Sequence, residues 1–329
     1  MLHWLLAGGL GFADKWGGFV PEEDFYYKLL ARHYDIELSD TPDYLICSQN
    51  GHSHIKYDCV KIVDIGENIV PDFNEFDYAV GFDHLEFGDR YLRVPLYVFF
   101  AEYPKLAERA TPPPDDVLLN RKFCSFVVTN GGYGDPMRTK FFHALSKYKR
   151  VDSGGRYLNN IGGNVKDKMA FCSQYKFNIA FENSSSPGYT TEKVMQPLSC
   201  FSVPIYWGNP LIAEDFSPAS LVCVKDEADF DRAIEEIIRL DTDDAAYLEK
   251  AKAPCLVQPH DYYEKELERF LCHIIDQPIE KAHRLNKYGF QAIHRSRMRR
   301  LYAIQDALAA PVKCLRRIKS RLGKLCLVL

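Results

Sequence analysis

The chain has 329 residues, with 47% hydrophobic and 26% charged side chains and a formal net charge of −4. These values are ordinary for a soluble globular enzyme, and they exclude a mostly disordered or collagen-like chain. The length is sufficient for two α/β domains, and no apolar run of the sequence reaches the roughly 18 residues that a membrane-spanning helix needs.

The first third of the chain predicts several short strands and one helix. Residues 1–12 lack the basic start and the cleavage site of a signal peptide, so we predict a buried first strand there. Between residues 16 and 34, helical spacing places Phe25, Leu29 and Leu30 on one side. Apolar runs then predict strands at 44–48, 60–65, 78–82 and 92–97.

Residues 104–116 contain three consecutive prolines and two acids, which predicts a loop or an inter-domain connection. Beyond it we predict strands at 124–129, 177–181, 204–207 and 221–224, with helices that begin near Arg138, Thr190, Asp229 and Asp243. Alternating apolar strands and helices indicate parallel sheets covered on both faces. The sequence therefore predicts an α/β fold of two facing, Rossmann-like, doubly wound domains at 1–115 and 116–280. A ligand is expected in the cleft between them, at the carboxyl ends of the strands.

Residues 281–329 form a predicted tail with its own charge. From Lys281 onward, 13 Lys and Arg residues face one acid, Asp306, whereas the rest of the chain carries 28 basic and 44 acidic side chains. Near the end, basic residues surround an apolar stripe made by Leu315, Ile318, Leu322 and Leu325. This pattern is typical of a basic amphipathic helix on an anionic membrane surface. Docking onto the acidic body and nucleic-acid binding are alternatives, and we favour the membrane over nucleic acid because the tail has few aromatic residues.

The ten cysteines are spread through the chain, and none forms a C-x-x-C pair. Most of them lie in apolar runs, which predicts buried free thiols in a reducing cytosol rather than a disulfide framework or a zinc site.

The densest polar cluster is FENSSSPGYTTEK at 181–193, directly after the apolar strand YKFNIAF. A strand, a small-residue loop and a helix start place free backbone N–H groups and a positive dipole end together, which suits a diphosphate. Lys193 adds a cation, Asn183, Ser184 and Tyr189 add hydrogen-bonding groups, and Glu192 has the chemistry to bind sugar or ribose hydroxyls. An ordinary polar loop before a capped helix is the alternative.

The same cluster, followed by VPIYWGNP, closely resembles the signature of the α1,3/α1,4-fucosyltransferases, especially the bacterial ones. The segments IGEN, PDFNEFDYAVGFDHLEFGDRYLRVPLY and SFVVTN with MRTKFFHAL appear in the order of that family, from about residue 16 to 271. The resemblance implies a GT-B fold and inverting transfer of L-fucose from GDP-fucose to an N-acetylglucosamine hydroxyl, most simply O3, of a lactosamine-type glycan. It also implies a place in lipopolysaccharide O-antigen or Lewis-antigen synthesis, or in protein glycosylation.

The resemblance also assigns roles to individual residues. Glu67 of IGEN matches the general base, and Arg138 of MRTKFF matches an arginine on the diphosphate. The residues that match those holding GDP and fucose are Asn183, Tyr189, Glu192 and Lys193; Glu67 and Glu192 are expected to be catalytic. Another sugar-nucleotide-dependent glycosyltransferase of the same fold, or an inactive nucleotide- or glycan-binding homologue, remains an alternative.

Two Asp-x-Asp sequences, at 229–231 and 241–243, raise the question of a metal. Both lie where helices are predicted to start, and acidic residues are common there without a metal. We therefore expect no metal ligands and no required cofactor beyond the donor sugar nucleotide. The expected location is the cytoplasm, peripherally on the inner face of the cell membrane.

Overall fold

The structure of the chain is a computed structural model that describes residues 4–5, 10–13, 19–129, 131 and 134–325; the side chains of residues 4–5, 306 and 309–325 lie outside the description. It divides into two compact units. Unit 1 comprises residues 1–80, 87–92 and 268–329, and unit 2 comprises residues 81–86 and 93–267.

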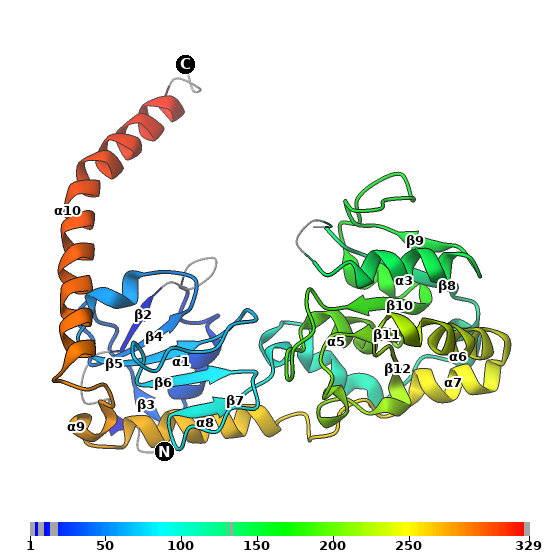
Figure 1. Cartoon of the computed structure of the whole chain (residues 1–329), viewed down its shortest axis with the longest axis horizontal. Helices are drawn as coiled ribbons and strands as arrows, with labels where there is room; N and C mark the ends of the chain where they lie inside the picture. The colour runs from blue at the N-terminus through cyan, green and yellow to red at the C-terminus, as the bar shows by residue number, and fades with distance from the viewer. Residues whose placement is uncertain (1–3, 6–9, 14–18, 130, 132–133, 326–329) are drawn as a thin grey trace. The chain divides into compact units, whose positions relative to one another are not determined.

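Unit 1 is built on a five-stranded sheet in which the strands follow chain order, β2-β4-β5-β6-β7. The pairs β2–β4, β4–β5 and β5–β6 are parallel. The bounds are β2 Leu10–Ala13, β4 Tyr44–Ser48, β5 Val60–Asp64, β6 Tyr78–Gly81 and β7 Tyr91–Arg93 (Figure 1). A short parallel pair, β1 (Trp4–Leu5) with β3 (Tyr34–Asp35), lies outside this sheet. Of the predicted first strand, β1 and the start of β2 are described, and residues 1–3 and 6–9 lie outside the described residues.

Helix α1 (Phe25–Leu30) is shorter than the spacing of residues 16–34 predicts. Asp24 caps its start by accepting a hydrogen bond from the Tyr27 N–H at 3.0 Å. Tyr26, Leu29 and Leu30 are buried and provide its packing face. The 3₁₀ helix η1 (Ser53–Lys56) follows β4 and contacts the long helix α10 (Phe290–Leu325).

The C-terminal part of the chain, which includes the predicted tail at 281–329, belongs to unit 1. The elements involved are the second half of α8 (Tyr262–Ile275), α9 (Ile279–Ala282) and α10. The carboxylate of Asp77, which is fully buried, accepts hydrogen bonds from the N–H groups of Lys61, Arg284 and Leu285 at 2.8, 2.6 and 3.0 Å. One acid before β6 therefore ties the returning segment to the sheet.

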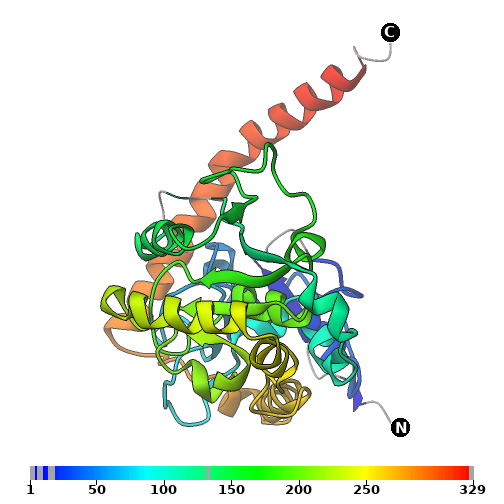
Figure 2. The same ribbon diagram turned by 90° about the vertical axis from the view of Figure 1, so that its right-hand side faces the viewer.

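Unit 2 contains a second five-stranded sheet, with the order β12-β11-β10-β8-β9 and parallel pairs throughout. The bounds are β8 Lys122–Phe126, β9 Val151–Ser153, β10 Tyr175–Phe181, β11 Val203–Trp207 and β12 Val222–Cys223. Its helices include α3 Met137–Ser146, α4 Lys168–Cys172, α5 Glu192–Ser199, α6 Phe230–Thr242 and α7 Asp244–Lys252 (Figures 1 and 2). The α/β prediction for this half, including its doubly wound order, is confirmed.

Both faces of the unit 2 sheet are covered. Alternate residues of β10, such as Phe177 and Phe181, enter the core shared with α3 and α6. Between them, Asn178 faces the other way and its amide donates to the Cys172 thiol of α4 at 3.4 Å. Helix α5 lies with α4 rather than with α3, since α4 and α5 contact each other and no α5 residue enters the α3–α6 core among the described residues.

Residues 93–115, predicted to end the first domain, fall within unit 2. Instead of a plain loop, they form the 3₁₀ helices η2 (Leu96–Phe99) and η3 (Tyr103–Ala110), followed by α2 (Asp115–Leu119). Arg109 of η3 is buried, and its guanidinium donates to the carbonyl oxygens of Leu198 and Ala251 near the ends of α5 and α7. These carbonyls have few intrahelical partners, so the arginine caps two helices at once.

Two general features of the chain complete the description. The eight cysteines whose side chains are described are all free, and five of them are buried. No helix in the described part of the chain combines the length and apolarity needed to cross a membrane. The tail is helical as far as Leu325, whereas the apolar stripe from Leu315 lies outside the described side chains.

Candidate functional site

A pocket of about 280 Å³ lies at the point where the strand order of unit 2 reverses. From β8 the chain moves to β9 on one side and then to β10 on the other, so loops from β8 and β10 diverge at their carboxyl ends. Such a switch point is the usual ligand site of an open parallel sheet. The pocket is lined by Val127, Val128, Thr129, Arg138, Lys168, Asn183, Glu192 and Lys193.

A buried carboxylate fixes the start of α5 at this pocket. Glu182, fully buried directly after β10, accepts hydrogen bonds from the Thr191 N–H at 2.8 Å and the Thr191 hydroxyl at 2.7 Å. The Thr191 hydroxyl in turn caps α5. The ammonium of Lys193 lies 3.1 Å from Glu182 and 3.4 Å from Glu192. Lys193 is therefore held in one position at the helix N-terminus.

The charges of this group shift one another's pKa values, and burial raises the pKa of Glu182. Burial lowers the pKa of Lys193, whereas the neighbouring Glu182 and Glu192 carboxylates raise it. The effect of the carboxylates is larger, so the pKa of Lys193 lies above its usual value. Burial raises the pKa of Glu192, but the positive charges of Lys193 and Lys168 lower it by more. The pKa of Glu192 therefore lies below its usual value. Glu192 is thus an ionised hydrogen-bond acceptor at neutral pH. It is suited to bind hydroxyl groups and unsuited to act as an acid.

Arg138 of α3 lines the side of the pocket next to Asn183. Its side chain is buried, and its guanidinium donates to the Asn183 side-chain oxygen at 3.0 Å. Burial lowers the pKa of Arg138, and the nearby Glu182 carboxylate opposes this shift. The Asn183 carbonyl accepts from the Asp135 N–H at 2.9 Å, which joins the loop before α3 to the end of β10. A Cβ added at Gly134 would collide with the Arg138 guanidinium, so the loop passes directly over it.

The serine-rich loop at 184–190 is braced by the second sequence motif, VPIYWGNP. Asn209, which is buried, accepts from the Gly188 N–H at 2.8 Å and donates to the Thr190 hydroxyl at 3.0 Å. The Ser185 hydroxyl donates to the Gly208 carbonyl at 2.7 Å. The two motifs, separated in sequence, therefore form one structural element behind the pocket.

Gly188 carries the first testable prediction. Its φ is +80°, and an added Cβ would collide with the Phe82 carbonyl oxygen. We expect Gly188→Ala to lower the free energy of unfolding by about 1–3 kcal/mol, because both the backbone conformation and the contact are unfavourable. Urea unfolding measures the change. Gly163→Ala is the control, because a Cβ added there would meet no atom within 4 Å and its φ is not positive; equal stability of the two variants would contradict the prediction.

The structure brings four of the six predicted site residues together: Arg138, Asn183, Glu192 and Lys193 line the pocket. Tyr189 is not among the lining residues; it is buried, with its ring 5.2 Å from that of Phe82. Glu67 belongs to unit 1, where it is exposed in the bend that follows β5. Its position directly after a buried parallel strand agrees with the predicted loop.

Sequence reasoning missed Lys168 and Glu182. Lys168 begins α4, whose N-cap is Asp167, and the signal for it was the Asp-Lys pair before a short apolar run. The signal for Glu182 was an acid immediately after a seven-residue buried strand, where a charge needs a partner.

The two Asp-x-Asp sequences serve helices, as predicted. The Asp243 side chain accepts from the Ala246 N–H at 3.1 Å and caps α7, while Asp229 pairs with Arg232 at 2.6 Å. Among the described residues, no three His, Cys, Asp or Glu side chains are grouped to hold a metal ion.

A parallel sheet with cations and a helix N-terminus at its switch point is typical of proteins that bind nucleotide phosphates. Comparisons with known proteins give the family. Residues 10–100 match the "Alpha-(1,3)-fucosyltransferase FucT N-terminal domain", and residues 119–288 match "Glycosyltransferase family 10 (fucosyltransferase) C-term". The chain therefore belongs to glycosyltransferase family 10, the fucosyltransferases.

Individual relatives agree with this assignment. The chain is 36% identical over 283 residues to "Alpha-(1,3)-fucosyltransferase FucT" of Helicobacter pylori, an alignment that covers 73% of the chain and 58% of the relative. The chain thus spans less than two thirds of that relative's length. A solved α1,3-fucosyltransferase superposes with a TM-score of 0.71 at 30% identity, over 86% of this chain and 93% of that one. A second structure, described with GDP-fucose, gives a TM-score of 0.69 at 30% identity over 84% and 92%. The fold is α/β of the GT-B type, as predicted.

Proposed function

We propose that this protein transfers L-fucose from GDP-fucose, with inversion, to an N-acetylglucosamine hydroxyl, O3 in the simplest case, of a lactosamine-type glycan. The observation that carries the proposal is the pocket of unit 2, where Arg138, Lys168 and Lys193 provide cations beside the N-terminus of α5. Support for the donor comes from the related structure with GDP-fucose. A lipopolysaccharide or Lewis-type glycan, or a glycoprotein, is the corresponding acceptor class.

In this proposal the pocket of unit 2 lined by Arg138, Lys168 and Lys193, called the donor pocket, stabilises the leaving group. Negative charge grows on the diphosphate as the bond to fucose breaks, and fixed cations with a helix N-terminus stabilise that charge. Glu192, ionised, accepts hydrogen bonds from hydroxyls of ribose or fucose. Asn183, whose side chain is oriented by Arg138, adds a polar contact. No step requires a metal, because cationic side chains perform that role.

Inversion needs a base on the acceptor side. The acceptor hydroxyl attacks the fucose carbon from the face opposite the leaving GDP, and a carboxylate removes its proton. We assign this role to Glu67. Its side chain is exposed in the bend directly after β5, where an acceptor sugar has access to it.

The experiment that tests the proposal measures GDP release from GDP-fucose with N-acetyllactosamine, with and without EDTA. Acceptor-dependent release that survives EDTA is the expected result. Tight GDP binding without release from GDP-fucose would favour a different donor sugar or acceptor. Absence of both binding and release would favour an inactive homologue.

Lys168 carries a further prediction. It lines the pocket and its charge lowers the pKa of Glu192, so we expect it to contact the diphosphate. Lys168→Met should weaken GDP binding roughly tenfold, the value of one charge-assisted hydrogen bond to a phosphate. Calorimetric titration with GDP measures this. Lys166→Met, an exposed lysine two residues earlier that does not line the pocket, is the control, and equal affinities of both variants would contradict the assignment.

The basic C-terminal helix is proposed to hold the enzyme peripherally at an anionic, cytosolic membrane face, near lipid-linked acceptors. Support comes from the excess of Lys and Arg and from the apolar stripe in its sequence. Removing the residues after Pro311 should abolish binding to anionic vesicles while turnover of soluble acceptor is retained. Vesicle sedimentation measures binding, and unchanged binding of the shortened chain would contradict the proposal.

A further inference from the structure

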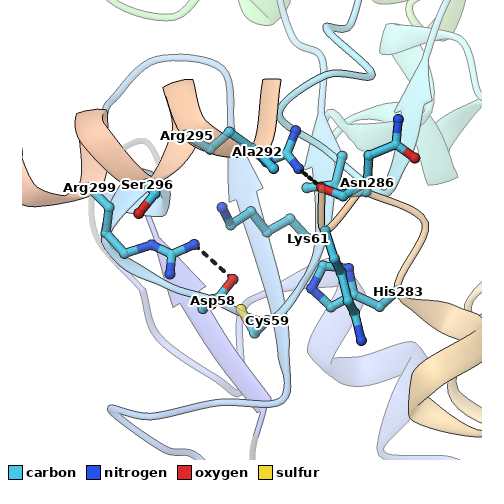
Figure 3. Close-up of a pocket in the computed structure, with 11 residues that line it drawn as sticks. Asp58, Cys59, Lys61, His283, Asn286, Ala292, Arg295, Ser296 and Arg299 are labelled. Atoms are coloured by element: carbon cyan, nitrogen blue, oxygen red, sulfur yellow. Dashed lines mark hydrogen bonds and ion pairs between the residues drawn. The ribbon is translucent and has the colours of Figure 1, made fainter. Parts of the chain in front are cut away.

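A second pocket, of about 560 Å³, lies within unit 1 between the sheet and the first turns of α10. From α10, Ala292, Arg295, Ser296 and Arg299 line it, at the spacing of one helix face. Lys61 of β5 lines the opposite side (Figure 3). Of the eleven lining residues four are Lys or Arg and one, Asp58, is an acid.

The centre of this pocket is a buried lysine without an acidic partner. Lys61 is only 4% exposed, and no hydrogen bond or ion pair of its ammonium is found among the described residues. Its side chain extends toward α10 (Figure 3). Burial lowers the pKa of Lys61, as expected for a charge removed from water. An ammonium whose side chain is largely buried, and which has no acidic partner, favours an anion in the pocket that it lines.

The nearby acids have other partners. Asp58 pairs with Arg299 at 2.7 Å, and Glu75 lies 3.4 Å from His54. The oxygens of Asp77 accept backbone N–H groups. None of these carboxylates lies within ion-pair distance of the Lys61 ammonium.

The α10 side adds a second uncompensated cation. The Arg295 guanidinium donates to the carbonyl oxygens of Asn74, at 2.8 Å, and Asn286, which orient it without neutralising its charge. The Nε–H of Arg299 is buried and has no hydrogen-bond partner. Lys287 lines the same pocket. The pocket therefore combines fixed cations with an excess of positive charge that protein groups do not balance.

We propose that this pocket is a binding site for a phosphate group, separate from the donor pocket of unit 2. Several converging cations match the two charges and multiple acceptor oxygens of a phosphate better than the single charge of a carboxylate. The volume also leaves room for the group that carries the phosphate. A soluble phosphate compound and a lipid headgroup share this chemistry.

The test is a calorimetric titration of the full chain with inorganic phosphate at constant ionic strength. Lys61→Met and Arg295→Gln should each weaken binding roughly tenfold or more. Arg300→Gln makes the same charge change on an exposed residue of α10 that does not line the pocket, and it should leave the affinity unchanged. Arg138→Gln, in the donor pocket, should retain the binding that depends on Lys61.

Stability provides an independent readout, because Lys61→Met removes a buried charge. We expect the melting temperature of this variant to equal or exceed that of the wild type, and phosphate to raise the wild-type melting temperature more than that of the variant. Phosphate binding that is unaffected by both Lys61→Met and Arg295→Gln, or weakened equally by Arg300→Gln, would overturn the proposal.

Sedimentation with phosphatidylcholine vesicles containing phosphatidic acid separates the two sources of phosphate. Binding that falls in Lys61→Met but not in Arg300→Gln identifies a lipid headgroup, because both variants retain the same tail. Lys61-dependent binding of inorganic phosphate with unchanged vesicle binding identifies a soluble ligand. If neither probe binds in a manner that depends on Lys61, the site is refuted.

Discussion

Replacing Glu67 by glutamine should reduce turnover by about 10² to 10⁴, the usual contribution of a general base, while GDP binding stays at its wild-type value. The amide keeps the size of the side chain but cannot accept the proton of the acceptor hydroxyl. Since Glu67 is exposed and belongs to unit 1, the change should leave the donor pocket of unit 2 intact. Steady-state rates of GDP release and calorimetric titration with GDP measure the two quantities.

Glu37→Gln is the matched control, because Glu37 is another exposed glutamate of unit 1. It should change neither quantity. Turnover of Glu67→Gln close to that of the wild type would remove Glu67 from the mechanism. A parallel loss of turnover and GDP affinity would instead assign it to donor binding.

Replacing Lys193 by methionine should have two separable effects. It leaves the Glu182 carboxylate fully buried without the cation that lies 3.1 Å from it, which should lower the free energy of unfolding by roughly 3–5 kcal/mol. It also removes a cation from the donor pocket, so GDP affinity and turnover should fall. Urea unfolding, GDP titration and rate measurements follow the effects separately.

The double variant Lys193→Met with Glu182→Gln distinguishes the structural role from the functional one. Removing the buried charge together with its partner should restore most of the stability, because a neutral amide can still bond with Thr191. GDP affinity and turnover should stay low. A double variant that binds GDP as tightly as the wild type would show that Lys193 acts only through stability. Lys176→Met, at a buried lysine 4.0 Å from Asp244, is the control for loss of a lysine in unit 2.

The sequence predicts most of the sheet because parallel strands buried on both faces are continuous apolar runs. The predicted strand at 44–48 is identical to β4, and those at 60–65 and 177–181 differ from β5 and β10 by one or two residues at an end. The observed strand β7 is shorter than the predicted strand at 92–97. It ends at Arg93, because Pro95 has no N–H group to donate to a neighbouring strand. β9, with three residues, is too short for a periodic signal.

Domain boundaries were harder to predict from the sequence. They depend on the surface against which a helix packs, and the hydrophobic pattern of the helix does not identify that surface. Nothing in the run of residues 104–116 indicates that Arg109 reaches carbonyls some 89 and 142 positions later in the chain. Similarly, the basic composition after Lys281 suggests a tail, whereas Arg284 and Leu285 bond to Asp77. Lys168 lines the pocket because the connection from β9 to β10 passes over the sheet, and the sequence does not reveal that strand order.

The return of the chain to unit 1 has a consequence for biosynthesis. A ribosome delivers the sheet strands of unit 1 first, then the whole of unit 2, and only afterwards α9 and α10. Until then the Asp77 carboxylate lacks two of its N–H donors and part of the sheet surface is uncovered. We expect unit 2 to reach its native form on the nascent chain before unit 1, which makes the unfinished N-terminal sheet a natural client for cellular chaperones.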